Sequence, residues 1–206
     1  MNETKSTELR DKKGLTEKEF LAAYIPGNWQ RPSCTADLAL ICGRTSQEIL
    51  LIRRGNHPSL GKWALPGGFA EPNETVDSAA SRELFEETGV KGLSPTLLGT
   101  FSDPGRDPRG WTITSLYGAF TETKPDYHAG DDAREAGWFS VSMKKENGLI
   151  SYTLKKDDIA INASVAFTLT ESPFGSSYSL REIENDGLAF DHSKLIALAL
   201  LKLHLN

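Results

Sequence analysis

Three glutamates within five residues are the part of this sequence best suited to chemistry. Glu83, Glu86 and Glu87 lie between Arg82 and Gly89 in a segment with a helical pattern. At about 100° per residue, positions i, i+3 and i+4 share one helix face, so these carboxylates are expected to point the same way. Each acid in the last helical turn costs roughly 0.3–1 kcal/mol. A divalent cation would relieve this repulsion, and oxygen ligands suit Mg²⁺ or Mn²⁺.

The helix that carries these acids is predicted from its ends and from its apolar stripe. Thr75 is suited to cap the N-terminus, and Gly89 is suited to end the helix in the left-handed conformation. Val76, Ala80 and Leu84 recur at i, i+4 and i+8 and predict a buried face beside the acids. The helix is therefore expected to be held firmly against a core.

A glycine pair precedes this helix. The segment 63–66 reads as a strand that runs into a tight loop at Gly67 and Gly68. Because glycine has no side chain, backbone carbonyls and amides there could approach an ion or a phosphate closely. Both glycines are therefore expected at the substrate-binding site, and Gly67 also at the metal.

Taken together, Gly68, Glu74 and the run Arg82-Glu83-Leu84-Phe85-Glu86-Glu87-Thr88-Gly89-Val90 resemble the full Nudix box, without a departure. The alternative, an ordinary solvated acidic helix end, does not account for the glycine, arginine and apolar positions that also match. The resemblance implies an α/β fold, an α/β/α sandwich with a mixed sheet. It also implies hydrolysis of a nucleoside diphosphate linked to a further group X.

The resemblance assigns roles to the box residues. Glu83, Glu86 and Glu87 would hold Mg²⁺ or Mn²⁺, which polarises phosphoryl oxygens and lowers the pKa of a bound water. Glu83 and Glu87 are the strongest metal ligands, Glu86 coordinates or acts as a base, and Arg82 orients the acids. The identity of the base stays open.

The general base is a choice among Glu83, Glu86 and Glu135. Glu135 follows Asp131 and Asp132 in an acidic loop that enters a predicted strand. These residues are candidates for a further metal ligand or a base. An ordinary charged turn explains them equally well.

Arginines supply the predicted contacts to the substrate. Arg53 and Arg54 end a predicted strand, where they either contact phosphate or are solvated. Arg106 and Arg109 lie in a loop with two prolines and two glycines, residues 103–110. Such a stiff loop presents arginine for bidentate recognition of phosphate or carboxylate, so both are expected to hold the distal group of the substrate.

Composition narrows the possible partners. The chain has 206 residues and a net charge of −5, which argues against general affinity for nucleic acid or anionic membranes. We find neither a membrane span nor a signal peptide in the sequence and expect a cytoplasmic protein. Cys34 and Cys42 are expected to be free thiols. An apolar last helix, together with the habit of the family, favours a homodimer.

The predicted organisation is one Nudix domain over residues 1–206. It begins with a tail and a short helix at 1–32, followed by a core at 33–143 that contains the box at 68–90. A β-rich insert is expected at 144–187 and a C-terminal helix at 188–206, capped by Asp191.

A narrower resemblance concerns the branch of ADP-ribose pyrophosphatase-like enzymes and Nudix-type transcriptional regulators of NAD metabolism. It is carried by the segments EFLAAY, WALPGGF, SDPGRDPRG, AGDDAREAGWF and LAFDHSKLIALAL. The regulators continue into a winged-helix domain, whereas this sequence stops at Asn206, which favours a hydrolase. ADP-ribose or a related nucleotide sugar is the expected substrate. The alternatives are a nucleoside triphosphate or dinucleotide pyrophosphohydrolase, and a non-catalytic ADP-ribose sensor.

Overall fold

The structure is a computed structural model that describes residues 9–130 and 133–203. The chain divides into two compact units, Met1–Arg31 and Pro32–Asn206, and each is described by itself. Within the described residues, none of the helices has both the length and the apolar character that crossing a bilayer requires.

The first unit contains one short helix, α1, Glu17–Ala23. Thr16 accepts a hydrogen bond from the backbone of Glu19, and the Glu19 carboxylate accepts one from the backbone of Thr16. This reciprocal capping box satisfies two amides that the helix itself leaves free. It fixes where the helix begins.

The second unit is built on one mixed sheet of ten strands. Its order is β10-β9-β8-β7-β2-β1-β6-β5, with β3 paired to β2 and β4 to β1. Strands β1 and β6 pair in parallel, and the other pairs are antiparallel. The bounds are β1 Ser33–Cys42, β2 Glu48–Arg54, β3 Trp63–Ala64, β4 Gly67–Phe69, β5 Thr96–Phe101, β6 Thr112–Thr121, β7 Ala133–Glu146, β8 Leu149–Lys156, β9 Ile159–Ser172 and β10 Gly175–Asn185.

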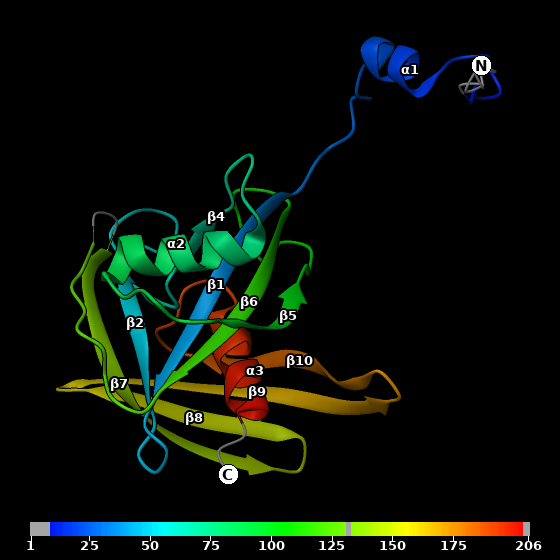
Figure 1. The fold of residues 1–206 in the computed structure, drawn as a ribbon. Helices are drawn as coiled ribbons and strands as arrows, with labels where there is room; N and C mark the ends of the chain where they lie inside the picture. The colour runs from blue at the N-terminus through cyan, green and yellow to red at the C-terminus, as the bar shows by residue number, and fades with distance from the viewer. Residues whose placement is uncertain (1–8, 131–132, 204–206) are drawn as a thin grey trace, which may run out of the picture. The chain divides into compact units, whose positions relative to one another are not determined.

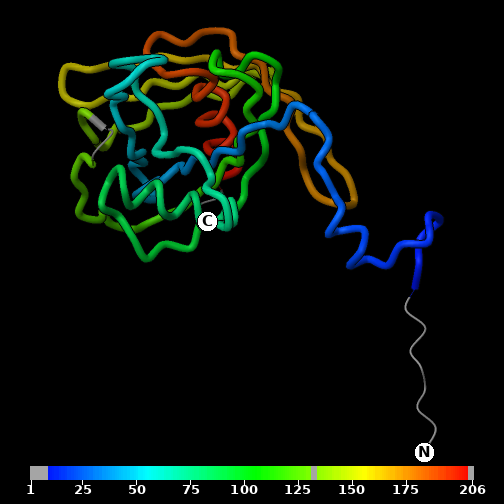
Figure 2. The backbone as a smooth tube through the Cα atoms, turned by 90° about the horizontal axis from the view of Figure 1, so that it is seen from above, coloured from blue at the N-terminus to red at the C-terminus, as the bar shows by residue number. Residues whose placement is uncertain are grey.

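Two helices cover the sheet of this unit. Helix α2, Val76–Thr88, lies over β1 and β2, and helix α3, His192–Lys202, lies on the other side of β1 (Figure 1). Seen from above, α3 runs through the interior with strands around it (Figure 2). Ten of its residues are buried, so this helix docks on the core of its own chain. The layered α/β architecture agrees with the predicted fold class.

Alternation along the strands produces two apolar layers. Leu38 and Leu40 of β1 face α2, where they pack with Ala79, Ala80 and Leu84. The intervening β1 residues Ala39 and Ile41 face the opposite layer, which contains α3. Because strand side chains alternate between faces, one apolar strand supplies both cores.

Residues 144–187 are β-rich, as the sequence predicts. They form the end of β7 together with β8, β9 and β10 in a continuous antiparallel run. Ile150, Leu154 and Val165 from this run are fully buried in the layer that contains α3. The insert thus completes a core instead of hanging free as a decoration.

Helix α2 ends as predicted at Gly89, which has a φ of 73°. A Cβ at Gly89 would also lie 2.1 Å from the ring of His128. We therefore expect Gly89→Ala to lower the free energy of unfolding by more than the roughly 1–2 kcal/mol that left-handed backbone costs alone. Gly92→Ala is the matched control, since Gly92 has a φ of 79° but open space beside it. Equal losses in urea unfolding would contradict the predicted contact with His128.

Candidate functional site

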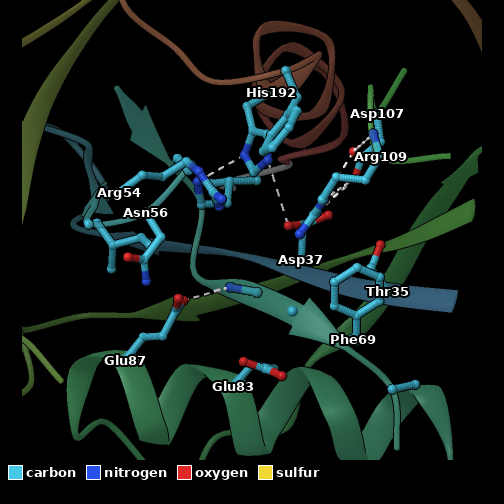
Figure 3. A pocket seen from close by; sticks show the side chains of 18 of the residues that line it. Thr35, Asp37, Arg54, Asn56, Phe69, Glu83, Glu87, Asp107, Arg109 and His192 are labelled. Carbon is cyan, nitrogen blue, oxygen red and sulfur yellow. Dashed lines mark hydrogen bonds and ion pairs between the residues drawn. The ribbon is translucent and has the colours of Figure 1, made fainter. Parts of the chain in front are cut away.

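A pocket of about 540 Å³ in the second unit lies between α2, strand β4 and the start of α3 (Figure 3). Gly67 and Gly68, predicted in a tight loop, belong to strand β4, which pairs with β1. The lining of the pocket comes from segments far apart in the sequence: β1, the end of β2, β4, α2, the loop 103–109 and α3. Of the predicted site residues, those that line it are Arg54, Gly67, Gly68, Arg82, Glu83, Glu87, Arg106 and Arg109.

One side of the pocket carries buried acids, and we call Glu83 and Glu87 its acidic side. Glu87 is only 9% exposed, and one carboxylate oxygen accepts a hydrogen bond of 2.9 Å from the amide of Gly67. Burial, opposed by this hydrogen bond and reinforced by the nearby charge of Glu83, raises the pKa of Glu87 to about 8. Burial likewise raises the pKa of Glu83. Both groups therefore favour a positively charged ligand.

Arg82 orients the acidic side chains of the box through a network of hydrogen bonds. It donates hydrogen bonds to Glu83 and Glu86, each of 2.8 Å, and to the carbonyl of Phe69 at 2.9 Å. Two further bonds, of 2.7 and 3.2 Å, reach Glu74, and they lower the pKa of that carboxyl. A bidentate pair of this kind fixes both side chains, so Glu74 braces Arg82 and Arg82 braces Glu83.

The three box acids do not converge fully. Glu86 is 53% exposed, pairs with Arg82 and is absent from the pocket lining. Within the described part of the chain, no three Asp, Glu, His or Cys side chains gather closely enough to form a ready-made metal site. The reason is that Arg82 draws Glu83 and Glu86 toward itself, whereas Glu87 turns to the Gly67 amide.

The acidic side nevertheless fits a divalent cation. Glu83 and Glu87 both offer carboxylate oxygens to the same pocket, as Mg²⁺ and Mn²⁺ require. Gly68 keeps space open there, since a Cβ at this position would lie 2.4 Å from an oxygen of Glu83. The glycine is therefore needed for close approach to the carboxylate.

The opposite side of the pocket is basic and aromatic. The guanidinium of Arg54 lies 4.9 Å from the ring centre of Phe190, and that of Arg109 lies 4.8 Å from Phe69 and 5.7 Å from Phe190. Burial, together with repulsion from Arg109, lowers the pKa of Arg54. Arg109 also forms a bidentate pair with Asp107 at 2.7 and 3.0 Å, which neutralises part of its charge, so the attraction of this side for an anionic ligand falls mainly to Arg54.

A second polar pair on this side was missed in the sequence. Asp37 and His192 both line the pocket, and His192 Nε2 lies 3.8 Å from Asp37 Oδ1 (Figure 3). We call Arg54, Arg109, Asp37 and His192 the far side of the pocket. The only local signal for Asp37 is one acid inside the apolar run 36–41. His192 gave none, because it reads simply as the first turn of a helix.

Three predicted site residues, Glu135, Arg53 and Arg106, form ion pairs with other side chains of the protein. Glu135 lies opposite Arg53 in the β2–β7 register and pairs with Lys156 at 2.6 Å, and neither Glu135 nor Arg53 lines the pocket. Arg106 lines the pocket but is 6% exposed and forms a bidentate pair with Asp191, 2.7 and 3.1 Å. Asp191 occupies the predicted capping position of α3 without a side-chain capping bond, because its carboxylate binds Arg106.

The remaining acidic candidates, Asp131 and Asp132, lie outside the described residues. The loop around them still meets the box helix. The amide of His128 donates to the Thr88 carbonyl and that of Gly130 to the Glu87 carbonyl, each at 2.9 Å. These bonds satisfy carbonyls that the end of α2 leaves free, and so they fix the turn that carries Glu87.

The mixed sheet between helices thus supports a pocket with carboxylates beside strand β4 on one side and arginines on the other. The NUDIX domain model matches residues 33–150. Because this match covers more than half of the chain, the protein belongs to the Nudix family. The predicted family and fold are thereby confirmed.

Individual relatives place the chain in one branch. It is 46% identical over 95 residues to an ADP-ribose pyrophosphatase of Methanocaldococcus jannaschii, covering 46% of this chain and 56% of the relative. It is 30% identical over 177 residues to the "ADPR responsive transcriptional repressor NtrR" of Acinetobacter baylyi, covering 82% of this chain and 71% of that protein. The chain thus matches little more than half the length of the archaeal relative.

A solved structure agrees with the fold. The MutT/nudix family protein from Enterococcus faecalis superposes with a TM-score of 0.73 at 35% identity, covering 91% of this chain and 69% of the other. This coverage includes residues beyond the 33–150 match. The predicted resemblance to the branch of ADP-ribose pyrophosphatases and ADP-ribose-responsive regulators is confirmed.

The pKa of Glu87 predicts how stability depends on pH. Between its ordinary value of 4.5 and about 8, the folded protein keeps a proton that the unfolded chain has released. The contribution of the protonated Glu87 to the free energy of unfolding is therefore complete below pH 4.5. It decreases as the pH rises and is lost once the pH has passed the folded-state pKa of about 8. In EDTA, the free energy of unfolding of Glu87→Gln should increasingly exceed that of wild type from pH 5 to pH 8. A difference that stays flat with pH for Glu87→Gln would contradict the burial effect.

Arg106 tests whether a buried arginine of the loop acts in structure or in binding. Removing it leaves the 10%-exposed Asp191 carboxylate with the Lys194 ammonium at 3.5 Å but without its bidentate partner, so Arg106→Ala should cost about 1–3 kcal/mol in urea unfolding. Arg53→Ala is the control, because its 46%-exposed side chain makes a surface pair that contributes about 1 kcal/mol or less. A stable Arg106→Ala with weakened ligand binding would instead support the sequence-based role in substrate contact.

Proposed function

We propose that this protein hydrolyses the diphosphate bond of ADP-ribose, or of a closely related nucleoside diphosphate linked to a sugar, with a divalent cation. The observation that carries the proposal is one pocket in which Glu83 and Glu87 face Arg54 and Arg109. A diphosphate with a cation at one end matches this distribution of charge. Similarity to the archaeal ADP-ribose pyrophosphatase supports the same substrate class.

The residues divide the work between the two sides of the pocket. Glu83 and Glu87, with the Gly67 backbone as a further candidate ligand, would hold Mg²⁺ or Mn²⁺. When bound, the ion supplies charge neutralisation of the phosphate and an acidified water. Arg82 fixes the direction of Glu83, and the Gly67 amide fixes that of Glu87. Arg54 and Arg109 would then bind phosphate oxygens on the side of the pocket that faces Glu83 and Glu87.

The position of the three candidate bases favours Glu83. It is the one of the three that lines the pocket, whereas Glu86 is turned outward and Glu135 is paired with Lys156. Glu86 keeps a supporting role through its bond to Arg82.

Sensing of ADP-ribose without hydrolysis is the second candidate. One relative, which matches 82% of this chain, is named as an ADPR-responsive repressor. A sensor needs the far side of the pocket but gains nothing from buried acids that repel each other. Glu83 and Glu87 therefore favour the enzyme.

The proposal is tested by a hydrolysis screen with ADP-ribose, NADH, diadenosine polyphosphates and nucleoside triphosphates, with Mg²⁺, Mn²⁺ or EDTA. ADP-ribose should be cleaved only with a divalent cation. Glu87→Gln should lower kcat by roughly 10²- to 10³-fold, the scale of losing one preorganised electrostatic contact. Release of AMP and ribose 5-phosphate is the readout.

A surface glutamate provides the matched control for this screen. Glu171→Gln alters an exposed acid of β9 outside the pocket lining and should keep wild-type turnover. Undiminished metal-dependent turnover in Glu87→Gln would refute the assignment of the acidic side. Tight binding of ADP-ribose without cleavage would instead establish the sensor.

A further inference from the structure

Asp37 is a buried acid that the proposed hydrolysis does not use. It lies in the middle of β1, is 7% exposed and reaches the pocket. Its Oδ2 accepts a hydrogen bond of 2.6 Å from the hydroxyl of Thr114 on the parallel neighbour β6. Oδ1 of the same carboxylate points toward His192 (Figure 3). One oxygen is thus anchored to the sheet and the other faces the pocket.

His192 is held in one defined state. Its Nδ1 accepts a hydrogen bond of 3.0 Å from the backbone amide of Leu65. A neutral imidazole that accepts at Nδ1 carries its proton on Nε2. Burial lowers the pKa of His192, which keeps the ring neutral at pH 7. The Nε2–H group is therefore a fixed donor directed at the Asp37 carboxylate.

The distance between these two groups is too long for a direct bond and suits an inserted oxygen atom. His192 Nε2 and Asp37 Oδ1 are 3.8 Å apart, beyond the range of about 2.7–3.2 Å for N–H···O bonds. One oxygen atom can lie about 2.8 Å from both Nε2 and Oδ1 and hydrogen-bond to each of them. That oxygen must accept from the imidazole and donate to the carboxylate.

Only some ligand groups meet this double requirement. A hydroxyl both accepts and donates, so it satisfies the pair completely. A phosphate oxygen is repelled by the carboxylate, and an ammonium group offers nothing to the N–H donor. We propose that Asp37 and His192 together bind one sugar hydroxyl of group X, and so select sugar-linked diphosphates. This inference rests on the proposed function for the position of the diphosphate.

The hydroxyl site adjoins the acidic side through a single residue. A Cβ at Gly67 would lie 2.5 Å from Asp37 Oδ1, and the amide of the same glycine donates to Glu87. The carboxylates of Asp37 and Glu87 therefore both adjoin Gly67. A diphosphate bound beside Gly67 would bring its attached group directly to Asp37 and His192.

Matched ligands test the inference on the wild-type protein. Binding is measured by calorimetry in EDTA, without turnover, for ADP-ribose and for the propyl ester of ADP, which lacks the distal sugar. ADP-ribose should bind about 10- to 100-fold more tightly, the scale of hydrogen bonds to a charged group and of an unpaired buried donor. Deoxy analogues of the distal ribose then identify the hydroxyl, since one of them should lose most of this preference.

Two substitutions locate the preference on the pair. The Asn side chain of His192→Asn can still accept from the Leu65 amide, but it is too short to place a donor where Nε2 lies. The Asn side chain of Asp37→Asn still accepts from Thr114, but its N–H group faces the Nε2–H group of His192. Both should bring the ratio of the two Kd values close to one. Asp158→Asn, an exposed acid outside the pocket lining, should keep the wild-type ratio. Thermal unfolding confirms that each variant is folded.

Several outcomes would overturn the inference. Equal affinity of wild type for both ligands means that the gap holds only water, and a preserved ratio in folded His192→Asn or Asp37→Asn places sugar recognition elsewhere. Failure to bind either ligand overturns it as well. If ADP-ribose is not hydrolysed but still binds more tightly than the propyl ester, only the proposed hydrolytic activity is refuted, because the binding is measured without metal.

Discussion

The structure depends on keeping two acidic side chains, Glu83 and Glu87, inside one pocket. Burial raises the pKa of both carboxyls, and the charge of Glu83 adds to the rise at Glu87. Acids buried in this way would turn outward unless the helix and their partners were fixed. Arg82 supplies the restraint for Glu83 and the Gly67 amide that for Glu87. The energetic cost of burying the two carboxylates is what gives the acidic side its affinity for a cation.

Much of the fold serves to hold the last turn of α2 in place. Small Ala79 and Ala80 are buried, so the helix lies close to β1. The loop after β6 closes over its end, and a Cβ at Gly130 would overlap the Glu86 carbonyl at 1.7 Å. Hydrogen bonds from this loop satisfy the carbonyls of the terminal turn. With its flank and its end both fixed, the helix cannot rotate its acids away from the pocket.

What the sequence predicts well is local, and what it misses depends on distant partners. The caps of α1 and α2 follow from short-range rules, as does the Arg82–Glu86 pair at i and i+4. The Arg106–Asp191 pair spans 85 positions and the Leu65–His192 bond 127, so no local pattern announces them. Glu135 illustrates the same limit, because its direction is set by the register of β2 with β7.

The two sides of the pocket separate recognition from cleavage. Asp37, His192, Arg54 and Arg109 offer a complete set of contacts for a sugar-linked anion without help from Glu83 or Glu87. A protein that kept the far side and lost the acids would still bind such a ligand, and would report its presence rather than consume it. In this chain both sides line one pocket, and the proposed hydrolysis gives the acids a role that binding alone would not.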